Sequence, residues 1–339
     1  MTGTAARKEN RKPDNIELDY VREEEMAFEI PRVKYTGRIR EVVIGSGPGA
    51  VKVGGADCYP FYRFEGEMPN PPRVAFEVWD SEPQEWQEWA IEPFRDVIGD
   101  PVMWAKKCIE TYRAELIVLQ LKSADPNGDN RPVEEVAEVV KKVSDAIQVP
   151  LLVWGTGSDD KDADLLRRIA ELSEGKNIAV GPVSDKNYKQ IGAMAIGYNQ
   201  VVMASSPIDV NLAKQLNILL TNLGVNEDKI LIDPTTGGLG YGLEYTYSVM
   251  ERDRMAALTQ EDAKLQFPII CNSAPEVWKT REARLTKDDD PRLGDEKKRS
   301  VLMEAVTAMT LLVAGADIVV MRHPDSVSLI KDMIGELCA

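Results

Sequence analysis

From Arg73 to the end of the chain, short apolar segments alternate with longer amphipathic segments. Eight apolar runs have the length of strands, and each is followed by apolar residues that recur with helical period. The apolar runs are 74–80, 116–123, 151–156, 178–184, 200–206, 230–236, 268–274 and 317–323. The helix candidates are 102–113, 132–147, 159–173, 185–196, 207–222, 243–260, 297–314 and 325–335. Near-continuous apolar strands that alternate with helices predict a parallel sheet covered on both faces.

Eight such units favour a closed (β/α)8 TIM barrel over residues 73–339, since barrels of this kind usually have about 250 residues. A doubly wound open sheet is the alternative. It is disfavoured because no G-x-G-x-x-G sequence follows the first strand, and "GSGPG" at 45–49 has no helix behind it. The α/β class is predicted in either case.

The N-terminal part of the sequence has a different rhythm. Residues 1–15 are polar and lack periodicity, so we expect a flexible arm over 1–28. Residues 29–72 form a β-rich extension in which 39–64 alternate β-branched residues with Gly and Pro clusters, a pattern typical of hairpins. The barrel of residues 73–339 would follow.

Composition narrows the function classes. Of the 339 residues, 43% are hydrophobic, which allows a large core, and the net charge of −15 argues against nucleic-acid binding. No apolar run approaches the roughly 18 to 20 residues that span a bilayer, so a cytoplasmic protein is expected. Four widely spaced cysteines and a single histidine make a sequence-local metal or iron–sulfur site improbable. Reduced, buried thiols are expected instead.

In a TIM barrel, ligands bind at the C-terminal ends of the strands. The residues at these ends are mostly hydroxyl and amide side chains, with little obvious catalytic machinery. They are Asp80, Ser123, Asp125, Thr156, Ser184, Ser205, Ser206, Asp233, Thr235, Thr236, Asn272, Ser273, Arg322 and His323. Asp80 and Asp233 could form an acid–base pair, but each is also a good turn or cap residue. His323 could move protons, or "HP" could simply end a loop.

The sequence "DPTTGGLGYG" at 233–242 is the strongest local signal. Glycines such as Gly237 and Gly238 permit positive φ or close approach to a flat ligand, and Thr hydroxyls can bond to amides. The Lys-Ser/Thr ending of a phosphate loop is missing. A ligand loop, an interface loop and a turn packed on its own domain all remain open.

Two loops are further candidates for contacts. The segment 79–94 carries three tryptophans among acidic residues, either as an interface or as a lid over the barrel. The charged segment 279–299 is a solvated loop or a partner contact.

Five of the strand-end motifs recur in order in one known family. They are "RVAFEVWD", "VLQLKSADPNGDNRPVEEV", "LLVWGTGSDDKDADLL", "DPTTGGLGYGLEYTYSVMERDR" and "PIICNSAPEVWKTREA". From about Glu29 onward the chain closely resembles the small (delta) subunit of the corrinoid iron–sulfur protein of the acetyl-CoA synthase/CO dehydrogenase (Wood–Ljungdahl) system. The resemblance implies a TIM barrel related to pterin-binding methyltransferases.

The resemblance also implies partners and cofactors. The partners would be a large subunit, a methyltetrahydrofolate methyltransferase and acetyl-CoA synthase/CO dehydrogenase. The large subunit would carry a [4Fe-4S] cluster and seat a corrinoid (cobamide), which this barrel would cover without catalysing a reaction itself. The candidate corrinoid contacts are Thr156, Ser205, Asp233, Thr235, Thr236, Gly237, Gly238, Asn272, Ser273, Arg322 and His323. The alternative is an independent pterin-dependent methyltransferase, in which Asp80, Asp233 and Asn272 would hold the pterin.

Overall fold

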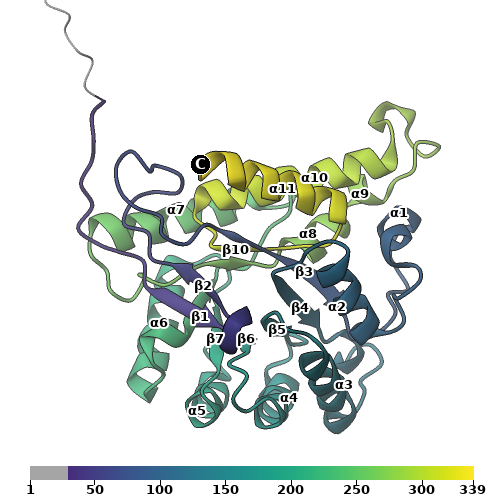
Figure 1. Cartoon of the computed structure of the whole chain (residues 1–339), viewed down its shortest axis with the longest axis horizontal. Coiled ribbons are helices and arrows are strands. Elements are labelled where there is room, and N and C mark those ends of the chain that lie inside the picture. Colours follow the sequence, from purple (N-terminus) through teal and green to yellow (C-terminus); the bar gives the residue numbers. More distant parts are fainter. Residues whose placement is uncertain (1–29) are drawn as a thin grey trace, which may run out of the picture. The chain divides into compact units, whose positions relative to one another are not determined.

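The computed structural model describes residues 30–339, so the predicted arm at 1–28 lies outside the described part. Residues Lys34–Ala339 form one compact unit. Its main feature is a parallel sheet of eight strands in the order β8-β7-β6-β5-β4-β3-β10-β9. Ile232 in the end strand β8 pairs in parallel with Ile269, the residue just before the other end strand β9, and this bridge closes the sheet into a barrel. The predicted TIM barrel is confirmed (Figure 1).

The strands are short and nearly all buried. They are β3 (Arg73–Trp79), β4 (Leu116–Gln120), β5 (Leu151–Trp154), β6 (Ala179–Val183), β7 (Val201–Ser205), β8 (Ile230–Asp233), β9 (Ile270–Cys271) and β10 (Ile318–Met321). Strand β9 is shorter than the predicted run 268–274 because the chain turns at Asn272 into a helix that begins at Ser273.

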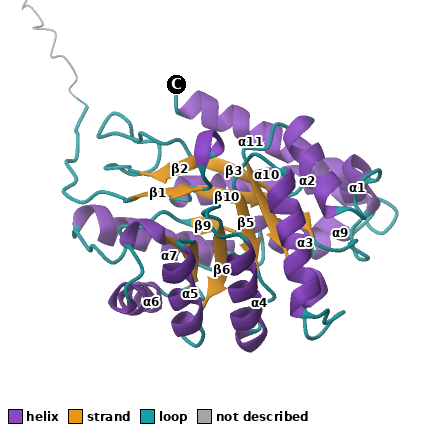
Figure 2. Ribbon diagram, turned by 60° about the horizontal axis from the view of Figure 1, so that its bottom comes forward, coloured by secondary structure: helices purple, strands orange, loops and turns teal. Residues whose placement is uncertain are grey.

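Helices surround the strands (Figure 2). The long ones are α2 (Pro101–Glu110), α3 (Val133–Ala146), α4 (Asp159–Leu172), α5 (Tyr188–Tyr198), α6 (Val210–Leu223), α7 (Leu243–Thr259), α10 (Glu296–Ala314) and α11 (Pro324–Leu337). Short helices are α1 (Glu88–Ile91), α8 (Ser273–Trp278) and α9 (Arg281–Arg284). The predicted charged segment 279–299 therefore contains α9 and the start of α10.

Local sequence sets where these helices begin and end. Asp100, Asp209 and Asp295 cap α2, α6 and α10, because each carboxylate accepts hydrogen bonds from backbone N–H groups of the first turn. Gly224 and Gly315 end α6 and α10 with φ of 109° and 119°, a conformation that favours glycine.

The predicted N-terminal hairpin is present as β1 (Glu41–Ile44) and β2 (Val51–Gly54), which pair antiparallel. Its side chains Val42, Ile44 and Val53 are buried in the same apolar cluster as the inward residues of the barrel strands. Asn177, just before β6, donates from its side-chain amide to the carbonyls of Val43 and Gly45. The hairpin therefore plugs the N-terminal end of the barrel and leaves the C-terminal end for a ligand.

Candidate functional site

The inward-facing side chains change from apolar to polar at the C-terminal end of the barrel. The apolar cluster inside the barrel includes Ala75, Val118, Met203, Leu231 and Val320. Because side chains alternate along a strand, the next inward position lies two residues further on. On β6 that position is Gly181, and on the other seven strands the positions are Glu77, Gln120, Trp154, Ser205, Asp233, Asn272 and Arg322. We call these seven residues the mouth layer.

Members of the mouth layer hold one another in place. The Nε atom of Arg322 donates to Glu77 Oε2 at 2.6 Å, and both side chains are almost fully buried. Gln120 Nε2 donates to Asn272 Oδ1 at 2.9 Å, and Ser205 Oγ donates to Asp233 Oδ2 at 2.7 Å. Buried polar groups need such partners, so these pairs fix the geometry of the mouth.

Burial perturbs the carboxyl group of Asp233 in the mouth layer. Burial raises its pKa to about 6, although hydrogen bonds from Ser205 and from the backbone N–H of Thr235 partly oppose the shift. The carboxylate is therefore largely ionised at neutral pH and can accept a further hydrogen bond or a proton.

Two other buried aspartates order the loops behind the mouth. Asp80 accepts hydrogen bonds from the backbone N–H of Ser123, at 2.9 Å, and from its hydroxyl, at 2.5 Å. Asp162 accepts from Thr156 and from the N–H of Gly157. Both carboxylates act as turn organisers, the non-catalytic interpretation that the sequence left open for Asp80. Thr156 is thus committed to Asp162 through its hydroxyl.

The glycine-rich loop at 233–242 is tightly packed on its own barrel. A Cβ atom on Gly237 would lie 2.5 Å from the carbonyl carbon of Gly242, and one on Gly238 would lie 2.8 Å from the carbonyl oxygen of Glu276. Thr246 on α7 accepts a hydrogen bond from the N–H of Gly237 at 2.8 Å. The turn interpretation therefore explains these two glycines, and their role as cofactor contacts stays a prediction.

Two threonines of this loop have opposite environments. Thr236 is buried, with 7% of its surface exposed, whereas Thr235 is exposed. Thr235 also has φ of 61°, which is strained for a β-branched residue. Of these two threonines, only Thr235 has a side chain accessible from outside, and its role as a cofactor contact stays a prediction.

We predict that Gly237→Ala lowers the free energy of unfolding by about 1 to 3 kcal/mol, because the new methyl group would collide with rigid backbone. Gly197→Ala is the control, since its Cβ would meet no atom within 4 Å in helix α5, and alanine should stabilise that helix. Urea unfolding of both variants measures the difference. Equal stabilities would show that the loop is loose rather than packed.

The two remaining candidates near the last strands are buried. The Ser273 hydroxyl donates to the carbonyl of Val320 at 2.7 Å. His323 caps α11, where its Nδ1 accepts from the N–H of Asp325 at 3.1 Å, and burial lowers its pKa to about 4. The imidazole is therefore neutral at pH 7 and caps a helix. This favours the second interpretation of the sequence "HP", in which it ends the loop after the strand. Its role as a cofactor contact stays a prediction.

The tryptophan-rich segment after β3 folds back over the barrel. Trp86 is buried against Trp79 and Trp104 in edge-to-face geometry, with ring centres 5.2 and 5.5 Å apart. The indole N–H of Trp89 donates to Ser300 Oγ on α10 at 3.1 Å. These contacts favour the lid alternative for residues 79–94.

Sequence reasoning missed Trp154 and two polar members of the mouth layer, Glu77 and Gln120. A signal was available for the two polar residues, because each is the lone polar residue inside an apolar parallel strand, "VAFEVW" and "LIVLQ". Both occur at inward parity and are fully buried. The candidate residues were taken from the ends of the apolar runs, and these two residues lie inside the runs.

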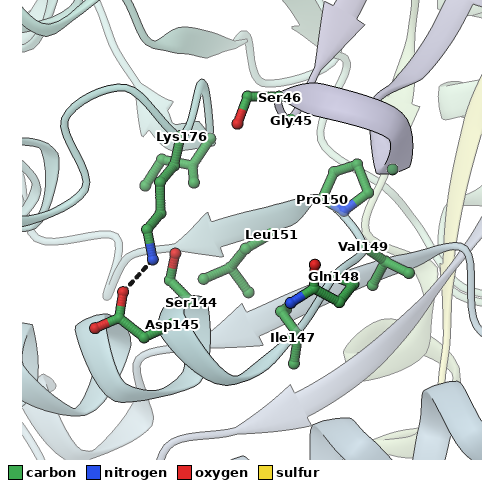
Figure 3. Close-up of a pocket in the computed structure, with 12 residues that line it drawn as sticks. Gly45, Ser46, Ser144, Asp145, Ile147, Gln148, Val149, Pro150, Leu151 and Lys176 are labelled. Atoms are coloured by element: carbon green, nitrogen blue, oxygen red, sulfur yellow. Dashed lines mark hydrogen bonds and ion pairs between the residues drawn. The ribbon is translucent and has the colours of Figure 1, made fainter.

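A cavity of about 240 Å³ lies at the end of the barrel opposite the mouth layer, between the hairpin and the start of β5 (Figure 3). Its charged residues, Lys176 and Asp145, are paired with each other. This cavity lies on the face that serves stability in TIM barrels, so the mouth layer is the better candidate site.

Within residues 30–339, no cluster of three or more His, Cys, Asp or Glu side chains could hold a metal ion. In the same part of the chain, no helix is long and apolar enough to cross a membrane.

The fold defines a TIM-barrel protein, and the mouth layer at the C-terminal ends of its strands is the candidate ligand site. Solved dihydropteroate synthases share the fold. The enzyme from Vibrio fischeri has a TM-score of 0.54 at 12% identity and aligns with 80% of this chain and 95% of its own. The Coxiella burnetii enzyme, in complex with pteroic acid, has a TM-score of 0.53 at 12% identity and aligns with 88% of this chain and 100% of its own.

The sequence identifies the family. The family described as CO dehydrogenase/acetyl-CoA synthase delta subunit matches residues 41–334, and the chain belongs to this family. It is 34% identical to the acetyl-CoA decarbonylase/synthase complex subunit delta of Archaeoglobus fulgidus, over 91% of this chain and 71% of that protein. The subunit delta of Methanothermobacter thermautotrophicus is 35% identical, over 91% and 78%. The resemblance drawn from the strand-end motifs is confirmed.

Proposed function

We propose that the chain is the small, non-catalytic subunit of a heterodimeric corrinoid iron–sulfur methyl carrier. It would cover the corrinoid held by the large subunit. Methyl groups would pass between a methyltetrahydrofolate methyltransferase and acetyl-CoA synthase/CO dehydrogenase. Membership of the delta-subunit family supports this proposal. The observation that carries it is the mouth layer, whose polar atoms lie at the end where TIM barrels in general bind their ligands.

The residues of the mouth fit a corrinoid. Its edge carries amide groups, which need neutral donors and acceptors. Gln120 Oε1 is buried with no hydrogen-bond donor among the described residues. Asn272 is half-buried, and Gln120 bonds only to its side-chain oxygen, Oδ1. The amide nitrogen of Asn272 makes no hydrogen bond within residues 30–339. These two atoms offer one acceptor and one donor to a flat, neutral ligand.

A bound corrinoid would supply the cobalt that carries the methyl group. The chain's own contribution would be to orient the macrocycle and to exclude water and protons from its reactive face. The neutral imidazole of His323 and the occupied carboxyl groups of Asp80 and Asp162 suit this role, since acidic groups free to donate protons would threaten a strong nucleophile.

The proposal is tested by purifying the chain alone and together with its large subunit. We expect no corrinoid or cluster absorbance from the isolated chain. In the heterodimer, this chain should change the corrinoid spectrum and slow its loss on dilution or gel filtration. Corrinoid bands in the isolated chain, or methyl transfer from methyltetrahydrofolate by that chain alone, would contradict the capping role.

We predict that Thr235→Trp weakens corrinoid retention in the heterodimer by at least about 10-fold, since a bulky group at the exposed loop position would hold the macrocycle away. Thr235→Gly is the matched control. It removes the side chain, relieves the strain of φ at 61° and should preserve both stability and retention. Corrinoid loss is followed by absorbance after gel filtration. Equal retention in both variants would remove Thr235 from the ligand face.

A pterin-dependent methyltransferase is the second candidate function. The free amide nitrogen of Asn272 and the carboxylate of Asp233 favour it, because together they could bind a donor- and acceptor-rich ring. Asp80 is less suited than expected, since both of its oxygens are bonded to Ser123. Titration of the isolated chain with methyltetrahydrofolate separates the two functions. Saturable binding that is lost in Asn272→Ala, with methyl transfer to free cobalamin, would favour the enzyme.

A further inference from the structure

A cavity of about 170 Å³ opens beside the mouth layer, where the ends of β3 and β10 meet the tryptophan-rich lid. Three indole rings and several basic side chains line it. The residues that matter are Trp79, Trp86, Trp278, Lys122, Arg284 and Arg322. Ligand pockets for whole organic molecules are usually about 300 Å³ or more. This cavity therefore suits a small ion, or one end of a larger ligand.

The guanidinium of Arg322 is held rigidly at the base of the cavity. Its central carbon lies 3.8 Å from the ring centre of Trp86 and 5.6 Å from that of Trp278. Its Nε is bonded to Glu77 at 2.6 Å. Stacking on a ring restrains the guanidinium plane without using its edges.

The edge of that guanidinium is left without a partner. Only 3% of Arg322 is exposed, yet its two terminal nitrogens make no hydrogen bond to any residue in 30–339, and the residue lines the cavity. The indole N–H of Trp86 is likewise buried with no acceptor in the described chain. A buried donor without an acceptor, as at Trp86, is costly, and the unpartnered edge of Arg322 opens on the cavity, so an acceptor bound there would stabilise this arrangement.

The charges around the cavity favour an anion. Lys122 and Arg284 form no ion pair within the described residues, and Lys279 is paired with Glu276 at 2.5 Å. Glu85 is the acidic residue among those that line the cavity. A local concentration of basic side chains is notable in a chain with a net charge of −15.

We propose that this cavity binds an oxyanion, a phosphate or a carboxylate group, through the terminal nitrogens of Arg322. A planar guanidinium fork matches two oxygens of either group, and Lys122 and Arg284 would add charge at the entrance. The oxyanion is a free ion or the charged end of a small ligand seated on the mouth layer. The cavity shares Arg322 with the mouth layer, but anion binding by the chain alone is measured without a corrinoid and does not depend on corrinoid capping.

The full-length chain is titrated by calorimetry and by tryptophan fluorescence with three probes: inorganic phosphate, acetate and methyltetrahydrofolate, whose glutamate tail carries carboxylates. We expect saturable binding of phosphate or of a carboxylate probe, with quenching or a shift of the emission. Phosphate binding without carboxylate binding assigns a phosphate site. Methyltetrahydrofolate binding that acetate or phosphate displaces assigns a carboxylate tail.

Two variants test the residues. Arg322→Lys keeps a positive charge beside Glu77 but removes the fork, and should weaken binding by roughly 10- to 100-fold. The double variant Lys122→Gln/Arg284→Gln lies at the entrance, should fold normally and should weaken binding by roughly 10-fold. Lys142→Gln on α3, an exposed lysine with no ion pair in residues 30–339, is the control and should bind as the parent does.

Failure of all three probes to bind would overturn the proposal, as would unchanged affinity in both variants. If the entrance variant weakened assembly with the large subunit while anion affinity stayed the same, the basic residues would serve a protein interface. That outcome also contradicts a small-ligand site. Corrinoid retention by the heterodimer is measured separately, so failure of phosphate and acetate to bind leaves the capping proposal standing.

Discussion

Glu77→Ala should lower the free energy of unfolding by about 3 to 5 kcal/mol, the usual loss when one member of a buried ion pair is removed. Glu77 has no exposed surface, and its carboxylate accepts from Arg322 Nε at 2.6 Å and from the indole N–H of Trp79 at 2.9 Å. Without it, the Arg322 guanidinium would be an uncompensated charge inside the barrel. Urea unfolding at pH 7 measures the loss.

Two comparisons isolate the cause. Glu115→Ala removes the partner of Arg73 in an ion pair whose side chains are 50% and 29% exposed, and should cost less than about 1 kcal/mol. Glu77→Leu/Arg322→Met removes both buried charges and should recover most of the loss, because no charge is left unpaired. If Glu77→Ala matched Glu115→Ala, the buried pair would not support the mouth layer.

Much of the barrel could be predicted from sequence because strand and helix periodicities differ clearly over residues 73–339. The hairpin was also visible, from β-branched residues broken by glycine and proline. The position of the hairpin as a plug of the barrel could not be predicted, because the contacts of Val42 and Ile44 with inward residues depend on tertiary packing. Strand β9 was overestimated because the run 268–274 is apolar throughout, and only the turn at Asn272 limits it.

The candidate site was predicted less completely. Strand ends correctly brought Ser205, Asp233, Asn272 and Arg322 to one mouth. The assignment of individual roles required geometry. Nothing in the sequence "DPTTGG" shows that Gly237 packs against backbone while Thr235 is exposed, and nothing in "RHP" shows that the imidazole caps a helix.

Partners far apart in sequence explain the remaining gap. Glu77 and Arg322 are 245 residues apart, and Gln120 and Asn272 are 152 residues apart. Each pair joins inward positions of two different strands. The pairing can therefore be predicted only when both the closed barrel and the register of its strands are known. A lone polar residue at inward parity in an apolar strand is the local sign of such a pair.

A buried carboxyl group on α7 leads to the second large effect. Asp253 has 1% of its surface exposed, and neither of its oxygens has a hydrogen-bond partner among the described residues. Burial raises its pKa from 3.8 to about 7. Ionising this carboxyl in the folded protein is therefore unfavourable, whereas it ionises freely when the chain unfolds.

The sign of the pH dependence follows from proton binding. Between pH 3.8 and about 7 the folded state holds a proton on Asp253 that the unfolded state has lost, so stability falls as pH rises through this window. Above pH 7 the stability is reduced by the full free-energy cost of ionising the buried Asp253 carboxyl. At about 1.4 kcal/mol per pKa unit, it amounts to roughly 4 kcal/mol.

Asp253→Asn cannot ionise and should therefore be more stable than the parent at pH 8, by a large part of that penalty. At pH 4 the two proteins should be about equally stable, because the parent carboxyl is then protonated. Asp332→Asn, at an exposed position of α11, should leave the pH profile unchanged. Urea unfolding from pH 4 to 8 measures all three proteins.

Since Asp80, Asp162 and Asp233 keep their own raised pKa values in every variant, the difference between parent and Asp253→Asn reports this carboxyl alone. A stability difference that did not grow with pH would show that Asp253 is solvated or paired in the folded protein.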